Sequence, residues 1–244
     1  MKLRIGYFIR NLTMRLHTHL FPRAAQALAS LALLYGCSSA NQAVTQAPSA
    51  GPGTPLTGLM SRQLALLPAQ YVALPTVGDN WEISPSYQGL LPILDEELID
   101  QARKRGVRNN WVSARDLTES AMRTGGIVKD PRELNVQQIR RVKAGDTPLG
   151  EPLGGDIRNL VALTNARYAL LPIEVRVDNR NGMRRGTVRM LLIDSRTARV
   201  IWADDVQSPI NREPTAAQDA LSPYGFRQLA RELASGFLDL VEGN

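Results

Sequence analysis

Residues 168–206 read YALLPIEVRVDNRNGMRRGTVRMLLIDSRTARVIWADDV, and this stretch decides the fold. It contains three runs rich in apolar and β-branched residues, which favour strands. The segments between the runs, residues 179–186 and 194–198, supply the Asn, Gly, Asp and Ser residues that reverse a chain. Three strands of an antiparallel meander are therefore predicted. They are Tyr168 to Val177, Thr187 to Ile193 and Arg199 to Val206.

Upstream of the meander, the pattern alternates between strand and helix. Tyr71 to Pro75 is typical of a buried strand that a proline stops, and Asn110 to Ser113 indicates a second strand. Between them, Ser86 to Arg105 has leucines four residues apart, acids before bases, and a closing Gly106. This arrangement predicts a helix whose charge order complements its dipole.

Four further helices complete the expected domain. They are Ala114 to Arg123, Val136 to Val142 with Asn135 as its cap, one that Asp156 caps, and one through Phe226, Leu229, Leu233, Phe237 and Leu240. The predicted order is strand, helix, strand, three helices, three strands, helix. We expect a single three-layer-like α/β (α+β mixed) domain, with a mixed sheet of about five strands, an antiparallel C-terminal meander and flanking helices.

The N-terminal end of the chain resembles a bacterial lipoprotein signal. The apolar stretch Ala24 to Leu34 follows a basic segment without acids and ends in Leu34-Tyr35-Gly36-Cys37. Its eleven residues are too few to span a bilayer, which takes about 20. The resemblance implies cleavage before Cys37 and a diacylglyceride on its thiol.

This interpretation divides the chain into three parts. Residues 1–36 are the signal peptide, and either Met1 or Met14 is the true start. Residues 37–58 are small, polar and proline-containing, which predicts a lipidated flexible tether. Residues 59–244 remain as the globular periplasmic domain. Because no aspartate follows Cys37 directly, the resemblance favours the outer membrane, on its periplasm-facing side.

Cleavage also limits the chemistry of the mature chain. His17 and His19, the only histidines, lie in the part removed. Zinc sites built on His and Cys, thiol nucleophiles and Ser-His-Asp triads are thereby excluded. Five of the 29 basic residues and none of the 23 acids are also removed, which leaves 24 against 23. Such a balance gives no indication of nucleic-acid binding.

Two features with catalytic potential have simpler explanations. Asp204 and Asp205 could bind a cation together, but neighbours on a strand point to opposite faces. The glycine-rich loop from Gly145 to Asp156 lacks the Gly-Lys-Ser/Thr ending of a phosphate loop. We therefore predict no catalytic residue, no metal site and no cofactor.

Arginines concentrate in the meander. Arg180, Arg184 and Arg185 lie in or beside one hairpin turn, where they could dock an acidic protein, an anionic lipid or a glycan polymer. The alternative is a solubilising turn that nearby acids neutralise. Trp81 and Trp111 could add interface contacts, although core packing also explains them.

The segment from Tyr71 to Val241 resembles the periplasmic lipoproteins related to the TolB amino-terminal domain. The similarity lies in the Val-Ala-Leu-Pro strand, the entry from Asn165 to Pro172, the ribbon from Leu191 to Trp202 and the closing helix. That group includes the curli secretion lipoprotein and the lipoprotein activator of penicillin-binding proteins. The resemblance implies a mixed α/β domain that acts by contact.

The resulting hypothesis is a lipid-anchored, non-catalytic adaptor or assembly factor for an envelope protein complex. Its partners are the membrane, through the lipid anchor, and an envelope protein of unknown identity. Anchoring raises the effective concentration of the domain near such a partner. Two alternatives stay open: a subunit of an oligomeric export or assembly ring, and an envelope hydrolase that uses only carboxylates.

Overall fold

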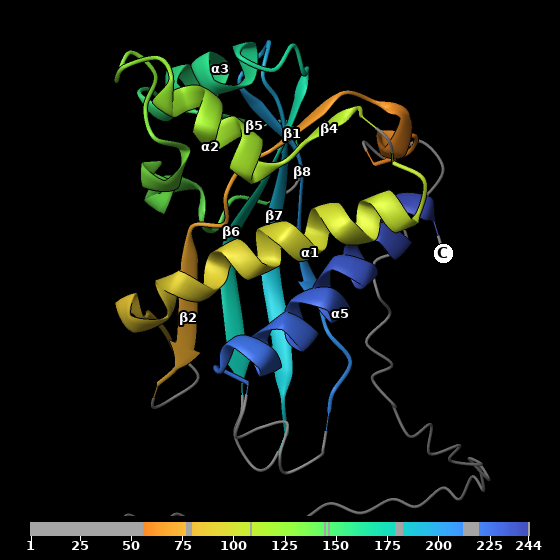
Figure 1. Cartoon of the computed structure of the whole chain (residues 1–244). Helices are drawn as coiled ribbons and strands as arrows, with labels where there is room; N and C mark the ends of the chain where they lie inside the picture. The colour runs from red at the N-terminus through yellow and green to blue at the C-terminus, as the bar shows by residue number, and fades with distance from the viewer. Residues whose placement is uncertain are drawn as a thin grey trace, which may run out of the picture. The chain divides into compact units, whose positions relative to one another are not determined.

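A mixed eight-stranded sheet forms the centre of the fold (Figure 1). Its long strands are β6 (Tyr168–Asp178), β7 (Arg185–Asp194) and β8 (Arg199–Gln207), which pair antiparallel in sequence order. The predicted meander and the mixed α/β class are thus confirmed. The computed structural model describes residues 56–76, 80–107, 109–143, 145, 147–178, 183–211 and 220–243.

Five short strands extend the sheet on both sides of the meander. They are β1 (Leu64–Leu66), β2 (Tyr71–Pro75), β3 (Trp81–Ile83), β4 (Trp111–Val112) and β5 (Thr147–Pro148). Both β1 and β2 run parallel to β6, at its beginning and its middle, and β3 pairs with β2 at the edge. The sequence analysis missed β1, β3 and β5, because two or three residues are too short for a period of two to be seen.

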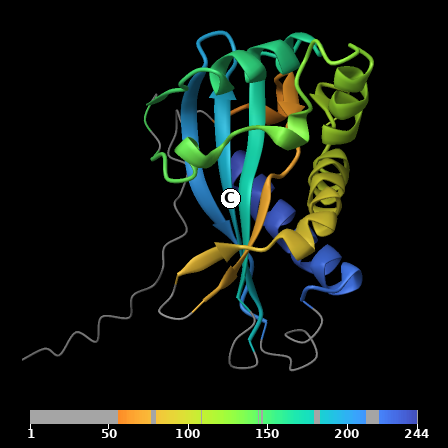
Figure 2. The ribbon, with the colours of Figure 1, turned by 90° about the vertical axis from the view of Figure 1, so that its left-hand side faces the viewer.

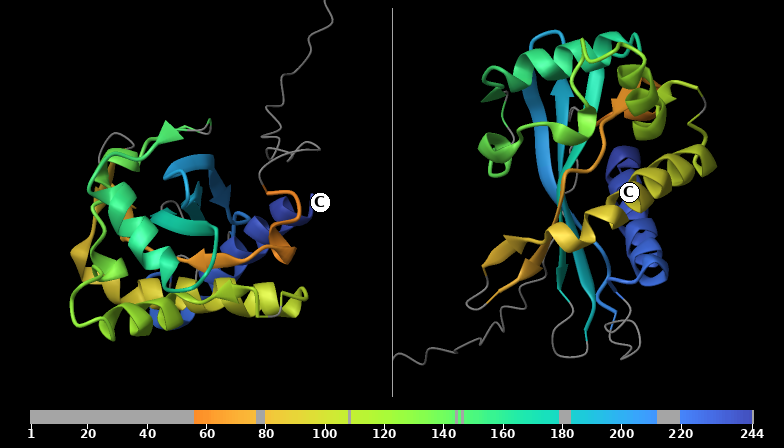
Figure 3. Two further views of the ribbon diagram at one scale, coloured as in Figure 1. Left: turned by 90° about the horizontal axis from the view of Figure 1, so that it is seen from above. Right: turned by 60° about the vertical axis from the view of Figure 1, so that its left-hand side comes forward.

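Four α-helices cover the sheet. They are α1 (Leu91–Lys104), α2 (Ala114–Met122), α3 (Leu153–Ala162) and α5 (Pro223–Glu242). Helices α1 and α5 lie against one face, over a core that contains Leu98, Val188 and Phe237. Helices α2 and α3 enclose a second core on the other face, which contains Leu117, Ile157 and Leu171. Figure 3 shows this layered arrangement from two further sides.

The first long helix begins later than predicted. Residues Pro85–Leu90 form a 3-10 helix, and α1 starts at Leu91 with Pro92 in its first turn. Proline has no N–H to donate, so it fits the first turn of a helix but not its interior. The C-terminal end of α1 agrees with the prediction that Gly106 closes the helix, because Gly106 follows the helix with a φ of 93°.

Two other predicted helices differ from the structure. Only Gln137–Ile139 is helical within 136–142, as a single 3-10 turn, and buried Ile139 anchors it to the second core. Helix α3 begins at Leu153 rather than after Asp156, because the Glu151 carboxylate accepts a hydrogen bond from the Gly155 N–H (2.9 Å). The N-cap position is Pro152, and the carboxylate of Glu151 just before it, rather than Asp156, accepts from the first turn.

A buried carboxylate links α1 to α5. Glu97 of α1 is 3% exposed and accepts hydrogen bonds from Arg227 and Arg231 of α5, at 3.4 and 3.2 Å. Burial opposes its ionisation, but the hydrogen bonds from Arg231 and Gln101 outweigh burial and lower the pKa of Glu97 below its usual value. The pair of helices is therefore held by charge as well as by apolar packing.

The predicted N-terminal features lie outside the described residues. These are the signal peptide, the lipidation site Cys37, and all of the predicted tether except residues 56–58. The division of the chain into signal, tether and domain stays a prediction. Within the described ranges, no helix is both long enough and apolar enough to span a bilayer.

We expect Gly186→Ala to lower the free energy of unfolding by about 1–3 kcal/mol, because it overpacks the core. A methyl group at Gly186 would lie 2.5 Å from Cδ1 and 2.9 Å from Cγ of Leu229, which is fully buried on α5. Urea unfolding of the full chain, followed by circular dichroism, measures the change. Gly89→Ala is the control, since nothing lies within 4 Å of its added methyl group. Equal effects of the two variants would contradict the prediction.

Candidate functional site

In the described structure, one part of the sheet surface has no helix packed on it and is lined by charged side chains. It is the lower half of the face opposite α1 and α5, which Figure 2 shows without a covering helix. Strand pairing places Glu174 of β6 beside Arg189 of β7, which lies beside Asp205 of β8. Residues two apart on a strand share a face. Two and four residues further along β6, Arg176 and Asp178 therefore lie on the same face as Glu174. Asp178 pairs with Arg185 of β7.

We call this surface the arginine face. It consists of Arg176, Arg185 and Arg189 of the meander, Arg140 from the preceding loop, and the carboxylates Glu174, Asp178 and Asp205. With four guanidinium groups against three carboxylates, its formal charge is positive. It joins segments up to 65 residues apart in the chain, from position 140 to position 205.

A chain of ion pairs orders these side chains. Arg140 donates to Glu174 (Nε to Oε2, 2.7 Å), and Arg176 forms a hydrogen bond to Asp205. Arg189 lies 3.2 Å from the other oxygen of Asp205. The paired side chains are 10% to 31% exposed, so water screens them only in part. Each guanidinium group is thereby held in a defined direction along the sheet.

The arginine face still has unused donor capacity. The Nε atoms of Arg176, Arg185 and Arg189 are buried and have no hydrogen-bond acceptor in the described part of the chain, although Arg176 Nε lies 3.6 Å from a carboxylate oxygen of Glu174. Leaving a buried donor unsatisfied costs about 1–3 kcal/mol.

Two aromatic rings border the arginine face. Arg176 lies over the ring of Trp81 of β3, 5.9 Å from its centroid, and Arg140 lies at the same distance from the ring of Tyr71 of β2. Both rings are partly exposed. Arginine together with Trp or Tyr is the composition that protein interfaces favour. Trp111, the other ring considered in the sequence, is only 5% exposed and belongs to the core.

Comparisons with known proteins give few similarities. No family model matches the chain, and no curated protein matches it. Its structure is similar to the C-terminal domain of LpoB from Salmonella enterica, with 13% identity, 59% of this chain and 81% of that chain covered, and a TM-score of 0.31. A lipoprotein from Neisseria meningitidis is 14% identical, with 59% and 77% covered and a TM-score of 0.29.

A hypothetical protein from Chlamydia trachomatis is similar at 16% identity. The match covers 74% of this chain and 98% of that chain, with a TM-score of 0.34.

Of the three arginines predicted to dock a partner, the structure describes Arg184 and Arg185, which lie on opposite faces of the sheet. Arg184 is 0% exposed; it faces α5, where it donates to Glu232 (2.7 Å) and to the Gly225 carbonyl (3.3 Å). Its neighbour Arg185 points to the opposite side and forms a hydrogen bond to Gln207. Strand alternation separates the two. Arg180 lies outside the described residues.

The sequence pointed to the meander arginines but not to their grouping. A bulge between Pro172 and Glu174 shifts the alternation of β6, so that Glu174 and Arg176 share the arginine face while Val175 enters the core. Asp204 and Asp205 lie on opposite faces, as alternation predicts, and only Asp205 reaches this surface. In the described ranges, no cluster of three or more His, Cys, Asp or Glu side chains could hold a metal ion.

Proposed function

We propose that this chain is a non-catalytic adaptor or assembly factor of the bacterial cell envelope. Lipid on Cys37 holds it at the outer membrane, and the arginine face docks an acidic surface of an envelope protein. The apolar stretch that ends at Cys37 supports the anchor, and the sequence resemblance to assembly and activator lipoproteins supports a role by contact. Confinement at the membrane raises the effective concentration for a partner there.

The observation that carries the docking proposal is the net positive, partly exposed arginine face, whose Arg176 lies over the partly exposed ring of Trp81. A partner carboxylate can accept from a guanidinium group whose direction is already fixed, so less side-chain entropy is lost on binding. Charge-assisted hydrogen bonds of this kind are stronger than neutral ones. The partly exposed Trp81 supplies adjacent apolar area.

Palmitate labelling and membrane fractionation test the anchor. We expect the native chain to carry label and to sediment with the outer membrane, and Cys37→Ser to lose both. Label that persists in Cys37→Ser, or an unlabelled native chain, would contradict the anchor. This result is independent of the docking surface.

Site-specific photo-crosslinking in cells tests the arginine face. A benzophenone side chain replaces Gln207, which lies on this face, or Tyr224, which is 81% exposed on α5 and serves as the control position. We expect one envelope protein to be captured from position 207 and not from position 224. Equal capture from the two positions would contradict docking at the arginine face.

Charge reversal is the second arm of this test. Arg185→Glu should reduce the crosslink from position 207 about tenfold, because it places a carboxylate against an acidic partner. Arg123→Glu makes the same charge change at an exposed position at the end of α2 and should leave capture unchanged. If both variants reduce capture equally, overall charge and not the arginine face is responsible.

A further inference from the structure

A cavity of about 710 Å³ opens on a different side of the molecule, between α1 and α2. Asp95 and Ile99 of α1, Ala114 and Thr118 of α2, and Pro68 before β2 are among the residues that line it. Its volume lies within the range of about 300–1,000 Å³ that is typical of ligand sites. The cavity shares no residue with the arginine face.

The carboxyl group of Asp95 is only half satisfied in this cavity. Its Oδ1 accepts a hydrogen bond from the Ala69 N–H (3.0 Å), while no described residue donates to Oδ2. Burial raises the pKa of Asp95 to about 7, although the Ala69 N–H and the charge of Arg132 act in the opposite direction. The protein thus contains an acid whose ionised form lacks a sufficient counter-charge.

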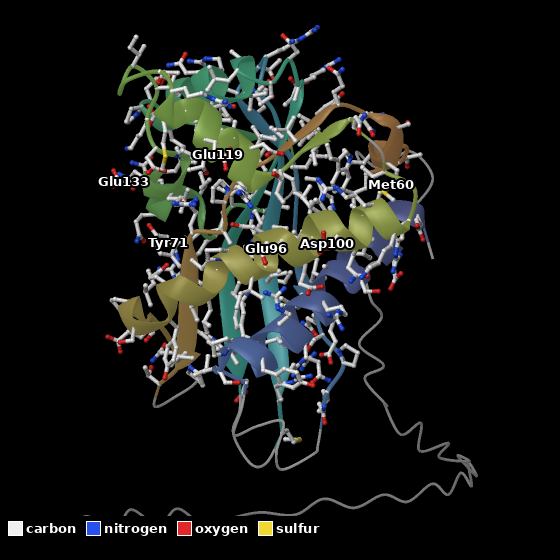
Figure 4. The ribbon with its side chains drawn as sticks, in the orientation of Figure 1. Met60, Tyr71, Glu96, Asp100, Glu119 and Glu133 are labelled. Atoms are coloured by element: carbon white, nitrogen blue, oxygen red, sulfur yellow. The ribbon has the colours of Figure 1, made fainter. Side chains whose placement is uncertain are left out.

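The charges around the cavity are predominantly negative. The lining holds five carboxylates and three guanidinium groups: Asp95, Glu96, Asp100, Asp116 and Glu119 against Arg103, Arg115 and Arg132. Arg103 pairs with Asp100 (3.8 Å), Arg115 with Glu119 (3.0 Å), and Glu96 with Arg227 of α5 (3.3 Å). Asp95 and Asp116 then remain against Arg132 in the lining. Figure 4 shows Glu96 and Asp100 on the front of α1 and Glu119 on α2 above them.

We propose that this cavity receives an arginine or lysine side chain from a basic segment of a partner protein, with Asp95 as its counter-charge. Charge complementarity selects a cation. The cavity is larger than one guanidinium or ammonium group requires, and apolar surface continues at its rim. Met122 is 60% exposed and Pro92 is also exposed in this lining, which suits the residues that flank the inserted side chain.

Binding of such a side chain depends on pH in a defined direction. A cation favours the ionised form of Asp95, so binding lowers the pKa of this carboxyl and strengthens as the pH rises. The charged groups around Asp95 are Arg132 from the loop after α2, Glu96 on its own helix, and Arg115, Asp116 and Glu119 across the cavity on α2. The pKa of Asp95 is about 7, so binding is expected to strengthen between pH 6 and pH 8.

Nuclear magnetic resonance titration of the full chain tests the proposal. The probes are a capped Gly-Arg-Gly peptide, its neutral citrulline analogue, and agmatine as a free guanidinium cation. At pH 8 we expect the arginine peptide to shift resonances of α1 and α2 and to lower the pKa of the Asp95 carboxyl. The citrulline peptide should bind about tenfold more weakly, as should the arginine peptide at pH 6.

Asp95→Asn is the decisive variant, since its amide oxygen can still accept from Ala69 and preserve the fold. It should weaken arginine-peptide binding about tenfold or more, while Glu96→Gln at the exposed rim should change binding much less. Agmatine binding as tight as that of the peptide would overturn the protein-segment assignment. Shifts confined to residues outside the cavity lining, or equal binding by Asp95→Asn, would overturn the site itself.

Discussion

Glu232→Leu should lower the free energy of unfolding by about 3–5 kcal/mol, because it leaves a buried charge without its partner. Arg184 is 0% exposed, and its Nη2 donates to Glu232 on α5 at 2.7 Å. Without Glu232, the guanidinium group keeps only the hydrogen bond to the Gly225 carbonyl in the described structure. Urea unfolding of the full chain, with circular dichroism as the signal, measures the loss.

A second substitution at the same pair separates its charge from its packing. Arg184→Met combined with Glu232→Leu removes both charges, so most of the lost stability should return. Glu119→Leu is the control, because it breaks a pair whose side chains are 82% and 51% exposed and should change stability little. If the double variant unfolds as easily as Glu232→Leu alone, lost packing rather than the buried charge explains the result.

Asp95→Asn should raise the free energy of unfolding at pH 8, by up to about 4 kcal/mol. The pKa of Asp95 is raised from 3.8 to about 7 in the folded protein, mainly by burial. Between these values the folded state binds more protons than the unfolded state. The contribution of Asp95 to stability therefore falls as the pH rises from about 4 to 7. Asparagine cannot ionise and avoids this loss.

The pH profile distinguishes this explanation from a general effect of the substitution. The stability difference between Asp95→Asn and the native chain should be small at pH 4 and should grow up to about pH 7. Urea midpoints measured across this range provide the test, with exposed Asp100→Asn on the same helix as the control. A difference that does not vary with pH would contradict the raised pKa. If Asp95→Asn both stabilises the protein and weakens peptide binding, the native Asp95 lowers the stability of the fold in order to bind the peptide.

The local elements follow from the sequence because apolar periodicity acts over a few residues. β2 has the predicted bounds Tyr71–Pro75, and the three meander strands agree with prediction to within two residues. The closing helix also follows its predicted face, since Phe226, Leu229 and Phe237 are all 0% exposed. The starts of α1 and α3 differ from the predicted ones, because they depend on Pro92 and on the Glu151 carboxylate rather than on apolar spacing.

The candidate surfaces could not be predicted in this way, because they join distant segments. The bulge in β6 brings Glu174 beside Arg189, and the loop residue Arg140 then reaches Glu174. Asp95 has its backbone donor at Ala69, 26 residues earlier, and its nearest cation on Arg132. No local pattern marks such neighbours.

By itself, the sequence determined the α/β class, the meander, the apolar faces of the long helices, and the prediction of a lipid anchor at Cys37. Tertiary structure alone decided that Arg184 is buried against α5 while Arg185 lies on the arginine face. It also decided that Asp95 is enclosed between α1 and α2. The physical reason is that secondary structure depends on neighbours along the chain. The surroundings of a charge depend instead on strand register and helix packing between residues far apart in sequence.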